Sequence, residues 1–259
     1  MEIHRNIFVF QLISTYFNLF QLISTYFQAF QLISIPFNMN TNLIKEIAYQ
    51  SGADVCGIAD IRRFQNAPDG FHPTDILTNA MSVIVFGKLF PKGTFLAKSN
   101  APYTLVRNQL IQQMDHLSLM LSSRIEEQGF FSVPIPSSEP YEYWDDQRRH
   151  GRGIISLKHS ARLAGLGSIG KNTLLINPKY GNRLWLGGVI TDVELEPDPV
   201  TEELCPPNCQ ICIDTCPQSA LNEITIDQKK CREICFTSTE GGGWLIACNL
   251  CRTQCPLAD

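Results

Sequence analysis

The sequence has little charge and no excess of positive charge. No Asp, Glu, Lys or Arg occurs from Asn6 to Ile44, and the whole chain carries 21 Lys and Arg against 25 Asp and Glu. The formal net charge of −4 argues against a surface that binds nucleic acid mainly by neutralising phosphates, although it is compatible with a local basic patch.

The uncharged beginning of the chain also lacks a long apolar run. Three near-identical copies with a period of ten begin at Phe10, Phe20 and Phe30, and each contains Gln and Ser. No stretch of about twenty predominantly apolar residues is therefore available to cross a membrane. The segment also lacks the cleavage site of a secretory signal. We expect translation to begin at Met39, so that residues 1–38 are an upstream extension assigned to the protein by mistake. If these residues are translated, we expect them to be disordered. An intact mass that includes the repeats would refute the first expectation.

Cysteine is nearly absent from most of the chain and crowded at one end. Cys56 stands alone, and the other nine of the ten cysteines lie between Cys205 and Cys255. Most of them form two runs, Cys205-Pro-Pro-Asn-Cys209-Gln-Ile-Cys212-Ile-Asp-Thr-Cys216-Pro and Cys248-Asn-Leu-Cys251-Arg-Thr-Gln-Cys255-Pro. Both runs end in C-x3-C-P, as in two-cluster ferredoxins, where the fourth cysteine of each run ligates the other cluster.

This spacing predicts two [4Fe–4S] clusters with exchanged fourth ligands. One cluster would use Cys205, Cys209, Cys212 and Cys255. The other would use Cys216, Cys248, Cys251 and one of the pair Cys231 and Cys235, for which we take Cys231. The first gap, from Cys205 to Cys209, is one residue longer than the usual C-x2-C.

Disulfides, zinc and unligated thiols compete with iron–sulfur clusters as the role of these cysteines. A disulfide framework is typical of small secreted chains, and this chain is long and shows no secretory signal. Zinc sites use C-x2-C pairs, but two runs that each close with Cys-Pro are not the usual zinc spacing. Unligated structural cysteines account for the two runs least well. Iron–sulfur ligation fits a reducing setting, so we expect a cytoplasmic protein.

The rest of the chain has the pattern of a mixed α/β domain, and we expect a body over residues 39–199 followed by a ferredoxin-type module over 200–259. Gly187 and Gly188 interrupt the last expected strand and suggest a bulge. Cys56 is expected to be a buried core residue. The expected helices are 42–50, capped by Thr41, and 104–128, and the expected strands are 55–59, 82–87, 130–135 and 183–193.

Two loops are candidates for a site. The polar, aromatic segment 137–152 either lines a pocket or is an exposed connection. The glycines of the segment 165–172 match G-x-G-x-x-G, but the residues before them read as a helix rather than a strand. Asn172 also stands where a phosphate-binding loop needs Ser or Thr. We therefore expect a turn where the backbone approaches another backbone or a large flat group.

These residues together resemble the epoxyqueuosine reductase family and its shorter relatives, which share a core with reductive dehalogenases. The resemblance runs through Ala164-Gly-Leu-Gly-Ser-Ile-Gly-Lys-Asn-Thr-Leu-Leu-Ile-Asn-Pro-Lys-Tyr-Gly181 and both cysteine runs. It implies a nitroreductase-like, cobalamin-binding domain with a two-cluster module, and Cys231 rather than Cys235 as a ligand. It also implies a corrin that lies against the glycine turn, with Gly165, Gly167, Ser168, Gly170, Lys171 and Asn172.

The sequence departs from that family in two places. The family's proton-donating aspartate has no acidic counterpart between Gly151 and Ser156, and the chain ends where the family continues into a tRNA-binding repeat domain. We therefore expect tRNA to be a doubtful substrate, and His159, Tyr143 or Tyr141 to supply a proton. The favoured function is an oxidoreductase that relays electrons from a ferredoxin- or flavodoxin-type donor to a corrinoid and an unknown substrate. The alternatives are an electron carrier, or an activator of another corrinoid protein, without a substrate of its own.

Overall fold

A four-stranded sheet organises the computed structural model, which describes residues 39–258. The expectations for residues 1–38 lie outside this range. The described residues belong to one compact unit, Met39–Asp259, and the division of this unit at residue 199 stays a prediction. The elements are α2 (Thr41–Gln50), β1 (Val55–Asp60), η1 (Ile61–Phe64), α3 (Pro73–Ile76), β2 (Ser82–Leu89), α4 (Lys92–Leu96), α5 (Ala101–Glu126), β3 (Ser132–Ile135), β4 (Tyr143–Asp145), β5 (His150–Arg152), α6 (Leu157–Leu163), β6 (Ser168–Ile169), β7 (Leu175–Ile176), β8 (Leu184–Thr191), α7 (Ile211–Asp214), α8 (Gln228–Cys235), β9 (Phe236–Ser238), β10 (Trp244–Ile246) and α9 (Leu250–Thr253).

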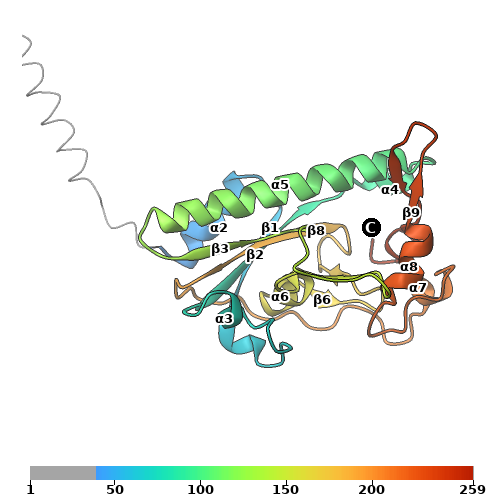
Figure 1. Ribbon diagram of the computed structural model, residues 1–259. Helices are drawn as coiled ribbons and strands as arrows, with labels where there is room; N and C mark the ends of the chain where they lie inside the picture. Colours follow the sequence, from blue (N-terminus) through green and yellow to red (C-terminus); the bar gives the residue numbers. More distant parts are fainter. Residues whose placement is uncertain (1–38, 259) are drawn as a thin grey trace, which may run out of the picture. The chain divides into compact units, whose positions relative to one another are not determined.

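The sheet has the order β1-β2-β8-β3, and each strand runs antiparallel to its neighbours. Strand β2 pairs with β8 over its whole length, from Ser82 opposite Thr191 to Leu89 opposite Leu184. Helices cover both faces of the sheet (Figure 1). The predicted mixture of helices and sheet is confirmed, and the antiparallel pairing makes α+β the better description.

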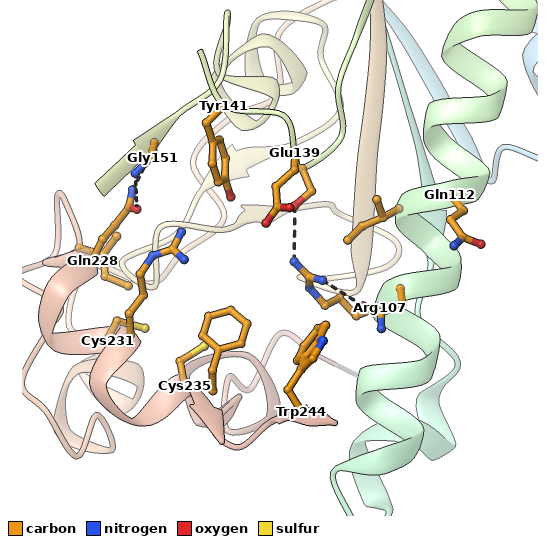
Figure 2. Close-up of a pocket in the computed structure, with 15 residues that line it drawn as sticks. Arg107, Gln112, Glu139, Tyr141, Gly151, Gln228, Cys231, Cys235 and Trp244 are labelled. Atoms are coloured by element: carbon orange, nitrogen blue, oxygen red, sulfur yellow. Dashed lines mark hydrogen bonds between the residues drawn. The ribbon is translucent and has the colours of Figure 1, made fainter. Parts of the chain in front are cut away.

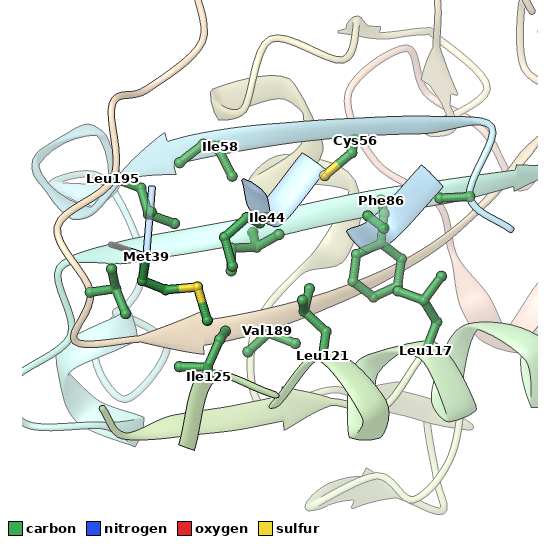
Figure 3. Close-up of a cluster of buried hydrophobic side chains, with 14 of the residues drawn as sticks. Met39, Ile44, Cys56, Ile58, Phe86, Leu117, Leu121, Ile125, Val189 and Leu195 are labelled. Atoms are coloured by element: carbon green, nitrogen blue, oxygen red, sulfur yellow. The ribbon is translucent and has the colours of Figure 1, made fainter. Parts of the chain in front are cut away.

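Alternation along β2 explains why helices pack on both faces. Ile84 and Phe86 lie in a core with α2 and α5, which is shown in Figure 3. Val83 and Val85 belong to a second core on the opposite face, where α6 packs. Because both faces are buried, the strand reads as a continuous apolar run. Cys56 lies in the first core, and burial raises the pKa of its thiol to about 12, so the prediction of a structural cysteine is confirmed.

The predicted bulge in β8 is wrong. Gly187 and Gly188 pair in unbroken register with Phe86 and Val85. A Cβ atom on Gly187 would lie 2.6 Å from Cε2 of Phe86 and 3.0 Å from Cβ of Met114. The glycine therefore leaves room for the Phe86 ring between the sheet and α5.

Two connecting segments contain regular structure. The segment 137–152 contains the β4–β5 hairpin, in which Tyr143 pairs with Arg152. The segment 62–78 includes the end of η1 and all of α3, where His72 forms a capping box with Asp75. Within residues 39–258, no helix combines the length and the apolar character needed to cross a membrane.

Candidate functional site

Four cysteines from the two runs surround one small cavity. Cys205, Cys209 and Cys212 of the first run line it together with Cys255, the last cysteine of the second run. These are the four residues that the crosswise scheme assigns to one cluster. Their convergence from opposite ends of the cysteine-rich segment requires the two runs to fold against each other, and α7 contacts α9 accordingly.

A second group gathers around Cys251. Burial is the largest effect on its thiol and raises the pKa to about 11, and the charges of Cys231, Cys248 and Cys216 add to the increase. A thiol that is protonated at neutral pH must lose its proton when it binds metal. Among the described residues, no three His, Cys, Asp or Glu side chains are close enough to hold a single ion. A cubane is a larger object than an ion, so its thiolates stand farther apart.

The glycine turn lies against the cysteine-rich segment. Asn172 donates from Nδ2 to the carbonyl of Cys251 at 3.0 Å, and Lys171 donates from Nζ to the carbonyl of Pro207 at 2.7 Å. The hydroxyl of Ser168 accepts from the backbone N–H of Leu204 at 2.9 Å. These polar residues therefore hold the segment that carries the cysteines, and their predicted contact with a corrin stays a prediction.

The glycines themselves are explained by close backbone approaches. Gly165 has φ +74°, and a Cβ there would collide with the carbonyl oxygen of Pro199. A Cβ on Gly167 would collide with the carbonyl oxygen of Ile176. Helix α6 precedes the turn, which is the wrong context for a dinucleotide fingerprint. Of the two expectations for this turn, approach to another backbone is therefore observed.

The end of the chain docks on the same side of the body. Asn182 is buried and donates from Nδ2 to the carbonyl of Arg252 at 3.0 Å, and the Arg252 guanidinium donates back to the carbonyl of Asn182. The guanidinium also lies over the ring of Phe90, 5.0 Å from its centroid. Next to this pair, Gly181 has φ +57°, and a Cβ there would overlap the carbonyl oxygen of Leu257.

We expect Gly181→Ala to destabilise the protein by about 2–4 kcal/mol, because the methyl group adds a backbone clash to the strain of a left-handed residue. Thermal unfolding of the anaerobic protein measures this loss. The matched control is Gly129→Ala, since Gly129 also has a positive φ (+85°) but nothing within 4 Å of its Cβ position. Equal losses in the two variants would show that the chain end does not depend on this contact.

A second, much larger cavity of about 890 Å³ adjoins the cysteines. Figure 2 shows it between α5, the segment around Glu139 and Tyr141, and α8. The β9–β10 hairpin closes another side through Trp244. The lining residues are Arg107, Asn108, Ile111, Gln112, Ser138, Glu139, Tyr141, Gly151, Ile226, Gln228, Cys231, Arg232, Cys235, Phe236 and Trp244. The expectation that segment 137–152 lines a pocket is thus confirmed for part of that segment.

The predicted proton donors are divided between this cavity and the surface. Tyr141 lines the cavity, whereas Tyr143 and His159 do not appear in its wall. His159 is exposed, and partial loss of hydration around its ring, followed by the charges of Lys158 and Arg162, lowers its pKa. A neutral imidazole outside the cavity is poorly placed to protonate a ligand inside it, and the roles of His159 and Tyr143 stay predictions.

Gly151 stands at the beginning of the stretch where the family pattern has its acid. A Cβ on Gly151 would lie 2.9 Å from the ring of Tyr141, so the tyrosine ring occupies the space that a side chain at 151 would use. Glu139 also lines the cavity, but nothing in its sequence context singled it out. Glu139 is a candidate because residues of α5 and α8, which are distant in sequence, line the same cavity.

Comparison with known proteins finds similar sequences among the epoxyqueuosine reductases. The chain is 29% identical over 228 residues to the epoxyqueuosine reductase of Bacillus anthracis, across 82% of this chain and 55% of the relative. It is 35% identical over 115 residues to that of Staphylococcus aureus, across 40% of this chain and 30% of the relative. The chain is similar in sequence to the epoxyqueuosine reductases. It spans about half the length of the first of these curated relatives.

Solved structures show that the fold is that of epoxyqueuosine reductases and reductive dehalogenases. The structure of epoxyqueuosine reductase from Streptococcus thermophilus matches with a TM-score of 0.59 at 19% identity, across 85% of this chain and 66% of that chain. A catabolic reductive dehalogenase, solved with 3-bromo-4-hydroxybenzoic acid, matches with a TM-score of 0.61 at 19% identity, across 83% of this chain and 31% of that chain. No protein-family model matches the sequence.

Proposed function

We propose that this epoxyqueuosine reductase relative is an iron–sulfur oxidoreductase that reduces a ligand bound in the large cavity. The observation that carries the proposal is the convergence of Cys205, Cys209, Cys212 and Cys255 on one small cavity. We assign the second cluster to Cys216, Cys231, Cys248 and Cys251, as the crosswise spacing of the two runs predicts. The charges of Cys231, Cys248 and Cys216 help to raise the pKa of Cys251, which is compatible with this grouping. Bound clusters would supply single electrons, and a corrinoid, as implied by the family, would provide a reduced cobalt for the substrate.

The large cavity favours an enzyme over an electron carrier. Cys231, which we assign to the second cluster, lies in its wall beside Cys235. A ligand in the cavity would therefore stand next to the cluster that feeds it, which a carrier without its own substrate does not need. Among the described residues that line the cavity, Tyr141 and Glu139 are the groups placed to hold or move a proton. Gln228 holds this part of the cavity wall in place by hydrogen bonds to the backbone of Gly151.

An anaerobic titration with cobalamin tests the choice between enzyme and carrier. We expect a stoichiometric change in the cobalamin absorbance, because the proposal places the corrinoid inside the protein. A matched variant, Trp244→Ala, removes an aromatic wall of the cavity without touching a cysteine and is expected to weaken that binding. Absence of any binding by a protein whose clusters are intact would support the carrier.

Epoxyqueuosine in tRNA is the second candidate for the substrate. One solved epoxyqueuosine reductase contains an epoxyqueuosine-modified tRNA stem loop, and it matches this chain with a TM-score of 0.57 at 20% identity, across 84% of this chain and 64% of that chain. The missing acid between Gly151 and Ser156 and the net charge of −4 weigh against this substrate. Mass spectrometry of nucleosides after incubation of the reduced protein with epoxyqueuosine tRNA decides the matter. The appearance of queuosine would establish the tRNA activity.

A further inference from the structure

Two arginines line the large cavity without a direct ion pair to a described carboxylate. Arg107 comes from α5 and Arg232 from α8. In the part of the chain that the structure describes, Arg107 donates to Asn108 at 3.0 Å and to Ser138 at 3.4 Å and forms no ion pair. Arg232 stacks on aromatic rings and forms no ion pair with a described carboxylate. The cavity therefore presents two guanidinium groups that form no ion pair with a described carboxylate, although the carboxylate of Glu139 lines the same wall.

Burial makes this arrangement costly for Arg107. Loss of hydration is the largest effect on its guanidinium and lowers the pKa, while Tyr141 and then Glu139 act in the opposite direction, without a salt bridge to Glu139. A partly buried cation is stabilised when an anion accepts its hydrogen bonds. The planar fork of an arginine suits a carboxylate or phosphate, which can accept two parallel bonds.

The remaining wall suits a flat apolar body. Trp244 and Phe236 lie with ring centroids 5.7 Å apart, and the guanidinium of Arg107 lies 5.7 Å from the centroid of Trp244. Tyr141 contributes a third aromatic ring, and its hydroxyl is directed into the cavity in Figure 2. Aromatic walls with a few convergent polar groups are typical of small-molecule sites.

We propose that the cavity binds a ligand with a flat apolar body and an oxyanion, a carboxylate or a phosphate, that pairs with Arg107 and Arg232. The ligand then lies against Cys231 and Cys235, which line the same wall. That this ligand accepts electrons from the clusters rests on the proposed function. Its preference for an anion rests only on the two arginines.

The test compares 2-naphthoate with 2-naphthamide, which have similar shapes but differ in charge, by anaerobic calorimetry on the full chain with its clusters loaded. We expect naphthoate to bind about 10-fold or more tightly than naphthamide, as is usual when a hydrogen bond to a charged group is lost. Arg107→Gln and Arg232→Gln should each abolish most of this preference. Arg124→Gln is the matched control, because Arg124 lies on the same helix but pairs with Glu127 on the surface, and it should leave the preference unchanged.

Equal binding of the two probes, no binding of either, or a preference that survives both cavity substitutions would overturn the proposal. Iron and acid-labile sulfide are measured on the same samples, so a failure of the iron–sulfur assignment is recognised separately. Repeating the titration with cobalamin present identifies the source of the oxyanion. If naphthoate still binds, the arginines serve an anionic substrate. If cobalamin displaces it but cobinamide, which lacks the phosphodiester, does not, they serve the corrinoid phosphate.

Discussion

Replacing Cys255 with serine is expected to remove the cluster of the first cysteine run, although Cys255 belongs to the second run. Iron should fall from about eight to about four atoms per chain, because one of two cubanes loses a thiolate. The physical reason is the position of Cys255 in the cavity lined by Cys205, Cys209 and Cys212. Iron analysis and electron paramagnetic resonance of the reduced protein measure the loss.

Double variants decide which thiols share a cluster. Cys255→Ser combined with Cys209→Ala should lose no more iron than Cys255→Ser alone, since both substitutions damage the same cluster. Cys255→Ser combined with Cys248→Ala should lose nearly all iron, because Cys248 belongs to the group around Cys251. The opposite pattern would mean that each run keeps its own fourth ligand. In that case the Cys255→Ser and Cys248→Ala double variant would lose only one cluster, and the Cys255→Ser and Cys209→Ala double variant would lose both.

Cys231→Ser is expected to remove the second cluster, whereas Cys235→Ser should retain it. The two residues lie one turn apart on α8, and their thiols are close enough to shift each other's pKa, upward for Cys231 and downward for Cys235. Cys231, unlike Cys235, is among the thiols whose charges act on Cys251. Iron content should therefore fall to about half in Cys231→Ser and stay near that of the unmodified protein in Cys235→Ser.

Each variant is the control for the other, because both replace a half-buried thiol on the same short helix. A loss of iron in Cys235→Ser alone would transfer the ligand role to Cys235. A loss in neither would mean that the two thiols exchange freely at one iron, and in that case only the double substitution would remove the cluster.

Local sequence patterns predicted much of the body because its elements are buried on defined faces. The apolar runs at residues 55–59 and 82–87 became β1 and β2, since a strand covered by helices on both faces needs no polar positions. The helix expected over residues 104–128 became α5, which buries Met114, Leu117 and Leu121 on one side. The spacing of the cysteines indicated the grouping in the first cavity, because cysteines that bind iron–sulfur clusters follow one another at characteristic separations along the chain.

Features that depend on distant segments had no local signal. The glycines at 165 and 167 indicated a close approach, but their partners, Pro199 and Ile176, became known only from the fold. Gly187 looked like a bulge because its role depends on the Phe86 ring of another strand and on α5. Arg107 lies on the long helix beside the apolar stripe, and only the packing of α8 and the β9–β10 hairpin turned that position into the wall of a cavity.

Acid-labile sulfide in the anaerobically purified protein is the most direct test of the account. Two cubanes predict about eight sulfides and about eight irons per chain, with a brown colour that fades in air. A colourless protein that contains zinc and no sulfide would contradict the account, because thiolates on zinc bring no inorganic sulfur with them.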